Sequence, residues 1–189
     1  MRRVGEKFAI RSSLIVGIVG WRLVREIVKL KEWDEWRNVA WAGNGLLLLG
    51  WVIGYFLPDI DDLFYVYISD PGDKIGNQAK TLLAGGDVRR AWDLLVATRG
   101  ERKNLPVHNI LTGLAVAVAG VWVVSSSGSP LAMGAVLGVT TRMFIGAVIE
   151  KNYMRWYWIF AREFSRREHQ VVMAVWGVLL GVQIIGLVR

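Results

Sequence analysis

The sequence predicts an all-α fold: a polytopic bundle of four to five transmembrane helices that carries a short cytoplasmic helical hairpin. Two observations lead to this prediction. Of the 189 residues, 53% are hydrophobic, and several apolar stretches approach the roughly 20 residues that a helix needs to cross a bilayer. Those stretches are residues 39–57, 107–125, 130–149 and 170–188. The chain length suggests one membrane domain, residues 1–189.

The amino-terminal stretch, about residues 8–28, allows two interpretations. It is apolar but carries Arg11 and Arg22. It is either a fifth, tilted span whose arginines reach the membrane surface, or a helix that lies in that surface. The sequence leaves both interpretations open.

Residues 58–104 form the large hydrophilic connection of the chain. Within it, residues 74–84 and 87–98 each show the apolar stripe of a short amphipathic helix, and Gly85-Gly86 separates them. Asp87 is placed to cap the second helix. We therefore expect a helical hairpin that packs on the membrane face.

The distribution of Lys and Arg predicts the orientation of the chain. The connections 58–104 and 150–170 are rich in these residues, whereas the connection 125–129 has none. Basic connections favour the cytoplasmic side. We therefore expect a membrane protein with its large loop in the cytoplasm. This rule also accounts for the net charge of +7, so we predict no nucleic-acid partner.

Two sets of residues indicate contact surfaces. Five aromatic residues recur at helical spacing and predict a helix that lies in the interface, with a partner-binding helix as the alternative; these are Tyr153, Trp156, Tyr157, Phe160 and Phe164. Three pairs of glycines four residues apart predict close helix packing within the chain, with dimerisation as the alternative. These are Gly50/Gly54, Gly134/Gly138 and Gly177/Gly181.

In the predicted topology, six polar residues converge at the cytoplasmic end of the bundle: Asp59, Asp61, Asp62, His108, Arg142 and Glu150. Carboxylates with an imidazole suit a divalent metal such as zinc, manganese or magnesium. A water bound to such a metal could attack a phosphoester or an amide. Alternatively, the aspartates only cap a helix end and His108 only anchors in the interface.

The motif Pro58-Asp59-Ile60-Asp61, followed by a loop and by His108 at the head of the next span, resembles the YdjM-like family of inner-membrane metal-dependent hydrolases. The resemblance covers about residues 45–150. It implies that Asp59, Asp61, Asp62 and His108 are metal ligands and that Glu150 is a candidate general base. It also implies a location in the bacterial inner (plasma) membrane. The substrate would be a lipid or a phosphoester.

The chain departs from this family's pattern at three points. The motif histidine is Asp62, the serine after His108 is Asn109, and the later His-x-x-x-Asp corresponds to Arg142 and Gly146. A buried arginine is costly unless it is paired. We therefore expect Arg142 to pair with Asp59 or Asp61 in place of a metal, which would make this chain a degenerate member.

Two functions follow from these residues. The first is a hydrolase-like membrane protein whose metal site is degenerate. The second is a non-catalytic membrane subunit or scaffold that contacts a membrane protein partner and the lipid bilayer. The sequence contains no Gly-x-Ser-x-Gly motif, no P-loop and no His-Glu-x-x-His motif, which excludes those enzyme classes on motif grounds.

Overall fold

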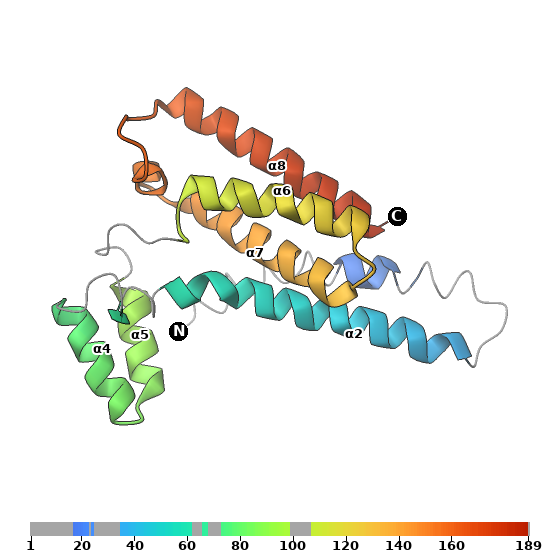
Figure 1. The fold of residues 1–189 in the computed structure, drawn as a ribbon, viewed down its shortest axis with the longest axis horizontal. Coiled ribbons are helices and arrows are strands. Elements are labelled where there is room, and N and C mark those ends of the chain that lie inside the picture. Colours follow the sequence, from blue (N-terminus) through green and yellow to red (C-terminus); the bar gives the residue numbers. More distant parts are fainter. Residues whose placement is uncertain are drawn as a thin grey trace.

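The computed structural model of this chain describes residues 17–22, 24, 35–61, 66, 67, 73–98 and 107–188. These residues form helices and turns, with no strand among them, which confirms the all-α class. The helices run in the order α2 (Glu35–Phe56), η1 (Leu57–Asp59), α4 (Lys74–Ala84), α5 (Val88–Ala97), α6 (Ile110–Ser126), α7 (Pro130–Ile149), η3 (Tyr153–Tyr157) and α8 (Arg166–Val188) (Figure 1).

Each of the four predicted spans falls on a helix. α7 has the predicted bounds, and α8 begins at Arg166, before the predicted start of the last span. Within the described residues, these two helices are long and apolar enough to cross a bilayer, while α6 is apolar but has 17 residues. Residues 17–22 are helical, and most of the predicted stretch 8–28 lies outside the described residues.

Helix α7 is the centre of the bundle. It packs against α2 on one side and against α6 and α8 on the other, and α6 also contacts α8 (Figure 1). Side chains from all four long helices form the core between them; Leu47, Val124, Leu137 and Leu180 are examples. This arrangement places the carboxyl end of α2 close to the carboxyl half of α7.

The contact between α2 and α7 is built on glycine. Gly50 and Gly54 of α2 lie directly on the α7 backbone, and Gly134 and Gly138 of α7 lie directly on the α2 backbone. A Cβ atom at any of these positions would overlap main-chain atoms, as at Gly54 with the carbonyl oxygen of Ala135. The predicted packing within the chain is therefore confirmed for these two pairs.

The third glycine pair does not form such a contact. A Cβ atom at Gly177 would meet side-chain atoms at ordinary contact distance, and one at Gly181 would meet no described atom within 4 Å. Helix α8 instead approaches α6 at Gly120, where the side chain of Gln183 fills the space that a larger residue would occupy. The prediction of close packing at Gly177/Gly181 is wrong because bulky side chains of α8 set its distance from the neighbouring helices.

Gln183 connects three helices through a buried amide. Its side chain is fully buried, and its Nε2 donates to the carbonyl oxygen of Ala117 at 2.9 Å and to Thr140 Oγ1 at 3.4 Å. Because the three residues lie on α8, α6 and α7, these bonds fix the register of the helices against one another. This contact is not predictable from the sequence, since one glutamine in an apolar stretch gives no sign of its partner.

Replacing Gln183 with Leu should lower the free energy of unfolding by about 1 kcal/mol, the size of a hydrogen bond between helices in a membrane. Leu has a similar volume, so the change removes the polar contact with little change in packing. Val182→Leu, at an exposed neighbouring position, is the matched control and should leave stability unchanged. Unfolding of the detergent-solubilised protein by increasing SDS measures both variants. An equal effect of the two variants would mean that the hydrogen bonds of Gln183 do not stabilise the bundle.

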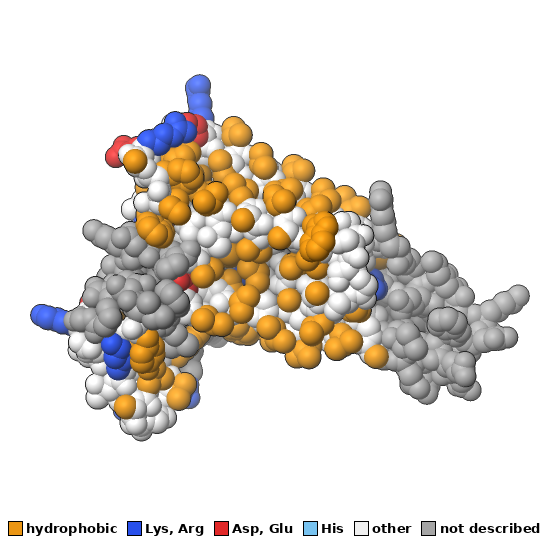
Figure 2. Space-filling view, viewed as in Figure 1, with side chains coloured by type: hydrophobic (Ala, Val, Ile, Leu, Met, Phe, Trp, Pro, Cys, Tyr) orange, Lys and Arg blue, Asp and Glu red, His pale blue; other side chains and the backbone are white. Residues whose placement is uncertain are grey.

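Many apolar side chains lie on the face of the bundle that Figure 2 shows. On α8 an exposed stripe recurs at helical spacing and consists of Val171, Val175, Val178, Val182 and Ile185. Exposed apolar residues also follow the outer face of α2, among them Leu49, Ile53 and Phe56. Contiguous apolar surface of this extent marks a region that contacts lipid or another protein.

The predicted helical hairpin is present as α4 and α5. Asp73 and Asp87 cap the two helices, since their carboxylates accept hydrogen bonds from Gly76 N at 3.1 Å and from Arg90 N at 3.2 Å. Gly86 lies between the helices with φ 78°, a conformation that glycine adopts without strain. The hairpin lies beyond the carboxyl end of α2 (Figure 1). Its cytoplasmic location stays a prediction.

The predicted interfacial helix between α7 and α8 is wrong. Only Tyr153–Tyr157 forms a short 3-10 helix, and turns and bends follow until α8 begins. The physical reason is that the aromatic rings pack on one another instead of lining one helix face: the Tyr157 ring stacks on Phe164, and the Tyr153 ring stacks on His169. The segment is therefore a folded loop with an aromatic core.

Candidate functional site

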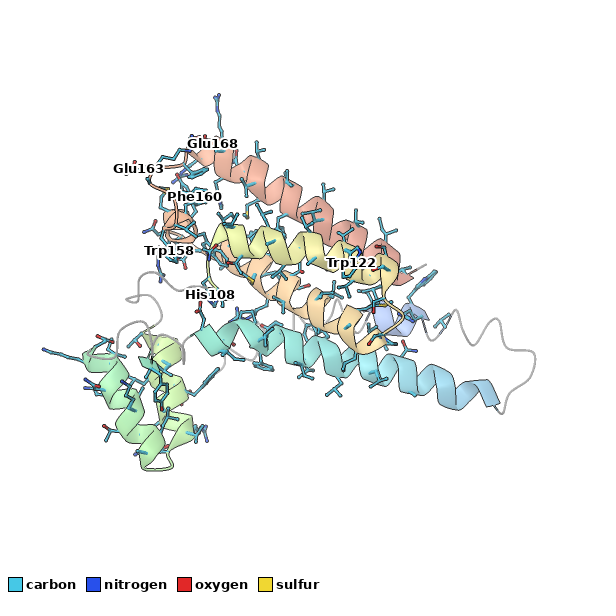
Figure 3. All side chains as sticks on the ribbon, viewed as in Figure 1. His108, Trp122, Trp158, Phe160, Glu163 and Glu168 are labelled. Carbon is cyan, nitrogen blue, oxygen red and sulfur yellow. The ribbon has the colours of Figure 1, made fainter. Side chains whose placement is uncertain are left out.

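Four of the six predicted polar residues, Asp59, Asp61, His108 and Arg142, lie where α2 ends, α6 begins and the carboxyl half of α7 passes between them. His108 marks this end of the bundle in Figure 3. Pro58 has no N–H to continue an α-helix, and the chain tightens there into the 3-10 turn η1. This turn buries Asp59, and Asp61 follows it in a buried position. The local sequence thus directs two carboxylates toward the neighbouring helices.

Asp59 pairs with Arg142 of α7. Arg142 Nη2 lies 3.1 Å from Asp59 Oδ1, and the side chains are 18% and 8% exposed, respectively. The guanidinium also lies 5.3 Å from the centre of the Tyr55 ring, where the ring face attracts a cation. Tyr55 precedes Asp59 by four residues, a spacing that could have signalled its role. The pairing that the sequence predicts for Arg142 is thus present.

Asp61 holds the start of α6. Its Oδ2 accepts hydrogen bonds from Val107 N at 2.9 Å and from His108 N at 3.0 Å, and it lies 3.0 Å from His108 Nδ1. The Asp61 side chain is fully buried, and its Oδ1 has no hydrogen-bond partner among the described residues. One carboxylate therefore joins the end of α2 to the first residues before α6.

Two further contacts fix the geometry around His108. The ring lies 5.9 Å from the ring of Trp156 in η3, centre to centre. Asn109 caps α6, because its side-chain oxygen accepts from Thr112 N at 2.9 Å. With a proton on Nδ1, His108 donates to Asp61, and this bond sets the orientation of the imidazole.

Glu150 and Asp62 are not brought to this cluster by the described contacts. Glu150 ends α7, and its carboxylate accepts from Asn152 N at 3.4 Å and lies 3.5 Å from Arg155 Nη1. These contacts hold it to the loop that follows α7. Asp62 lies outside the described residues. The general-base role of Glu150 and the ligand role of Asp62 stay predictions.

The described residues do not supply a metal-ligand set. Among them, no three Asp, Glu or His side chains gather in a way that could hold a metal ion. Asp59 is engaged by the guanidinium of Arg142, and Asp61 Oδ2 is engaged by three donors. A zinc site needs three or four protein ligands around one point. The metal-ligand roles of Asp59, Asp61 and His108 therefore stay predictions as well.

Comparison with known proteins finds no relative of this chain. A scan against protein-family models, a search of curated proteins and a search of solved structures each find no match for this chain. The resemblance to the metal-dependent hydrolase family thus stays an expectation from the sequence.

The backbone amides before α6, like Tyr55, are parts of the site that the sequence did not predict. Val107 N and His108 N are held by Asp61 across 46 and 47 residues of chain. Every residue except proline has a backbone N–H, so the sequence does not show which of these groups a carboxylate binds. Asp61 therefore resembles, in the sequence, a carboxylate that is available for a ligand. The structure instead assigns Asp61 to holding a helix start.

Proposed function

We propose that this protein is an integral protein of the bacterial inner membrane that acts as a non-catalytic subunit or scaffold. In this proposal, the ion pair between Arg142 and Asp59 takes the place of the hydrolase-like metal site. The observation that carries the proposal is the pairing of Arg142 with Asp59 at 3.1 Å, in a position where both side chains are largely buried. The pair connects α2 to α7, so its role is to hold the bundle together.

The surface supports the membrane location. The exposed stripe of α8 is formed by β-branched apolar side chains, which a water-soluble protein would bury. Trp122 is exposed at one end of the bundle, and Trp158 is exposed at the other (Figure 3). Tryptophan is enriched at both surfaces of a bilayer. The two residues would therefore mark the two boundaries of the apolar zone.

The charges support an orientation with the hairpin in the cytoplasm. The hairpin, the loop after α7 and the first turn of α8 carry exposed basic residues, among them Lys74, Arg90, Lys151 and Arg166. The turn between α6 and α7, at the opposite end of the bundle, is Ser127–Ser129 and has no charge. Basic connections favour the cytoplasmic side, so both basic segments would face it.

Electrostatics argue for the ion pair over a metal at Asp59. A carboxylate next to a guanidinium is already neutralised, and a divalent cation at the same carboxylate would be repelled by the arginine. At distances of a few ångströms this repulsion is on the order of several kcal/mol at a protein's effective dielectric constant. Arg142 therefore disfavours a metal ion at Asp59.

The second candidate function is the metal-dependent hydrolase. One observation favours it: Asp61 Oδ1 is buried and has no partner among the described residues, so this oxygen is available for a further ligand. A buried carboxylate oxygen without a partner is costly.

Analysis of the purified full chain tests the proposal. We expect the protein to remain in membranes washed with alkaline carbonate and to contain far less than one equivalent of zinc, manganese or magnesium by mass spectrometry. Asp59→Ala should leave this low metal content unchanged. Stoichiometric metal in the wild type, lost in Asp59→Ala, would favour the hydrolase. Release of the protein by carbonate would overturn the membrane assignment itself.

A further inference from the structure

The loop between α7 and α8 presents an apolar tip to the outside. Trp158, Ile159 and Phe160 are consecutive and are 37%, 46% and 40% exposed. The two residues before them, Trp156 and Tyr157, are buried. Three exposed apolar side chains in a row at the end of the bundle need a non-aqueous or amphipathic environment.

The tip is supported by a packed aromatic core. The Tyr153 hydroxyl donates to the carbonyl oxygen of Phe164 at 3.0 Å, and the Tyr157 and Phe164 rings stack with their centres 4.3 Å apart. The Tyr157 hydroxyl lies 3.0 Å from His169 Nδ1, at the start of α8. Burial, with smaller effects of Tyr153 and Glu168, raises the pKa of Tyr157 to about 12. The loop is thus held in shape from within.

Around the tip, positive charge is in excess. Residues 150–168 contain five basic and three acidic side chains, which gives a net charge of +2. Two acidic residues are paired within the segment, Glu150 with Arg155 at 3.5 Å and Glu168 with Arg162 at 2.8 Å. The basic residues outside these two pairs are Lys151, Arg166 and Arg167, and all three are exposed.

We propose that this loop binds the headgroups of anionic phospholipids. The apolar tip enters the boundary between headgroups and acyl chains, and Lys151, Arg166 and Arg167 contact the lipid phosphates. The inference rests on the proposed membrane location and adds a lipid class and a site to it. Interfacial tryptophan combined with juxtamembrane cations is the combination that an anionic leaflet attracts.

The position of the loop favours lipid over a protein partner. α8 follows directly after it, and the exposed apolar stripe of that helix begins at Val171, one turn after Arg167. Figure 2 shows the apolar surface of the bundle continuing up to the charged side chains at this end. The cations therefore lie at the edge of the surface that lipid would cover, at the level of the headgroups.

Lipid binding to the purified full chain in detergent tests the inference. Native mass spectrometry with added phosphatidylglycerol or phosphatidylcholine measures the preference for the anionic lipid. Arg166→Gln combined with Arg167→Gln should weaken phosphatidylglycerol binding by about 30-fold, which corresponds to the loss of two cations near an anionic surface. Phosphatidylcholine binding should not change.

The matched control removes two charges elsewhere. Lys74→Gln combined with Arg89→Gln, on α4 and α5, should keep the wild-type preference. No preference for phosphatidylglycerol in the wild type, or an equal loss in the control, would overturn the inference. Displacement of the lipid by inorganic phosphate would show a site for free phosphate and would also overturn it. If the protein resists carbonate but shows no lipid preference, only this inference fails; release by carbonate would instead remove the proposed function.

Discussion

Replacing Arg142 with Ala is expected to lower the free energy of unfolding by about 3–5 kcal/mol, the effect of removing one partner of a buried ion pair. The reason is the charge left behind. The Asp59 side chain is only 8% exposed, and Arg142 Nη2 lies 3.1 Å from its Oδ1. Without the guanidinium, the Asp59 carboxylate loses the opposite charge beside it in a poorly solvated position. Unfolding of the detergent-solubilised protein by SDS measures the loss.

The matched control is the exposed pair of the hairpin. Arg90 Nε lies 3.3 Å from Asp87 Oδ2, and the Arg90 side chain is largely exposed. Arg90→Ala should change stability by less than about 1 kcal/mol, because exposed pairs contribute little. A similar loss in both variants would mean that Arg142 acts through its general packing and not through a buried charge.

A double variant separates the ion pair from a metal site. Asp59→Ala combined with Arg142→Ala removes both charges. The loss in free energy of unfolding in this double variant should therefore be smaller than the sum of the losses in the two single variants. A coupling energy near zero would contradict a direct pair. If the Arg142→Ala variant instead bound a divalent metal, Asp59 would be a metal ligand whose binding Arg142 prevents in the wild type.

The sequence predicted the long helices well because the lengths of its apolar stretches are enough to locate them. Long uncharged stretches leave few alternatives to a helix, so α7 falls on residues 130–149 as predicted. Asp87 was recognised as a cap because the chemistry is local. An acidic partner for Arg142 was also predictable, since a cation within an apolar helix needs one at similar depth. The sequence left Asp59 and Asp61 open, and the structure shows Asp59.

The contacts that the sequence did not reveal depend on neighbours distant in the chain. Gln183 finds Ala117 O and Thr140 only once three helices have packed. The loop after α7 has the aromatic spacing of a helix but folds as a cluster around Tyr157. In both cases the deciding energy is tertiary packing, which overrides the local pattern.

Of the glycine pairs, the structure shows which ones carry the α2–α7 contact, and Gly54 gives the sharpest test. Gly54→Ala is expected to lower the free energy of unfolding by about 2–3 kcal/mol, the upper part of the range for overpacking. The added Cβ would overlap the carbonyl oxygen of Ala135. Main-chain atoms of a helix cannot rotate away as a side chain can, so the two helices must separate.

Gly45→Ala on the same helix should have the opposite sign. A Cβ atom at Gly45 meets no described atom within 4 Å, and Ala is favoured over Gly in a helix by about 1 kcal/mol. Gly45→Ala should therefore be neutral or slightly stabilising, and a loss at both positions would contradict the assigned contact.

Repeating the SDS unfolding at several protein concentrations distinguishes packing within the chain from dimerisation. An effect of Gly54→Ala that is independent of concentration places the glycine contact within one chain, whereas a dependence on concentration would mean that the same glycines also join two copies.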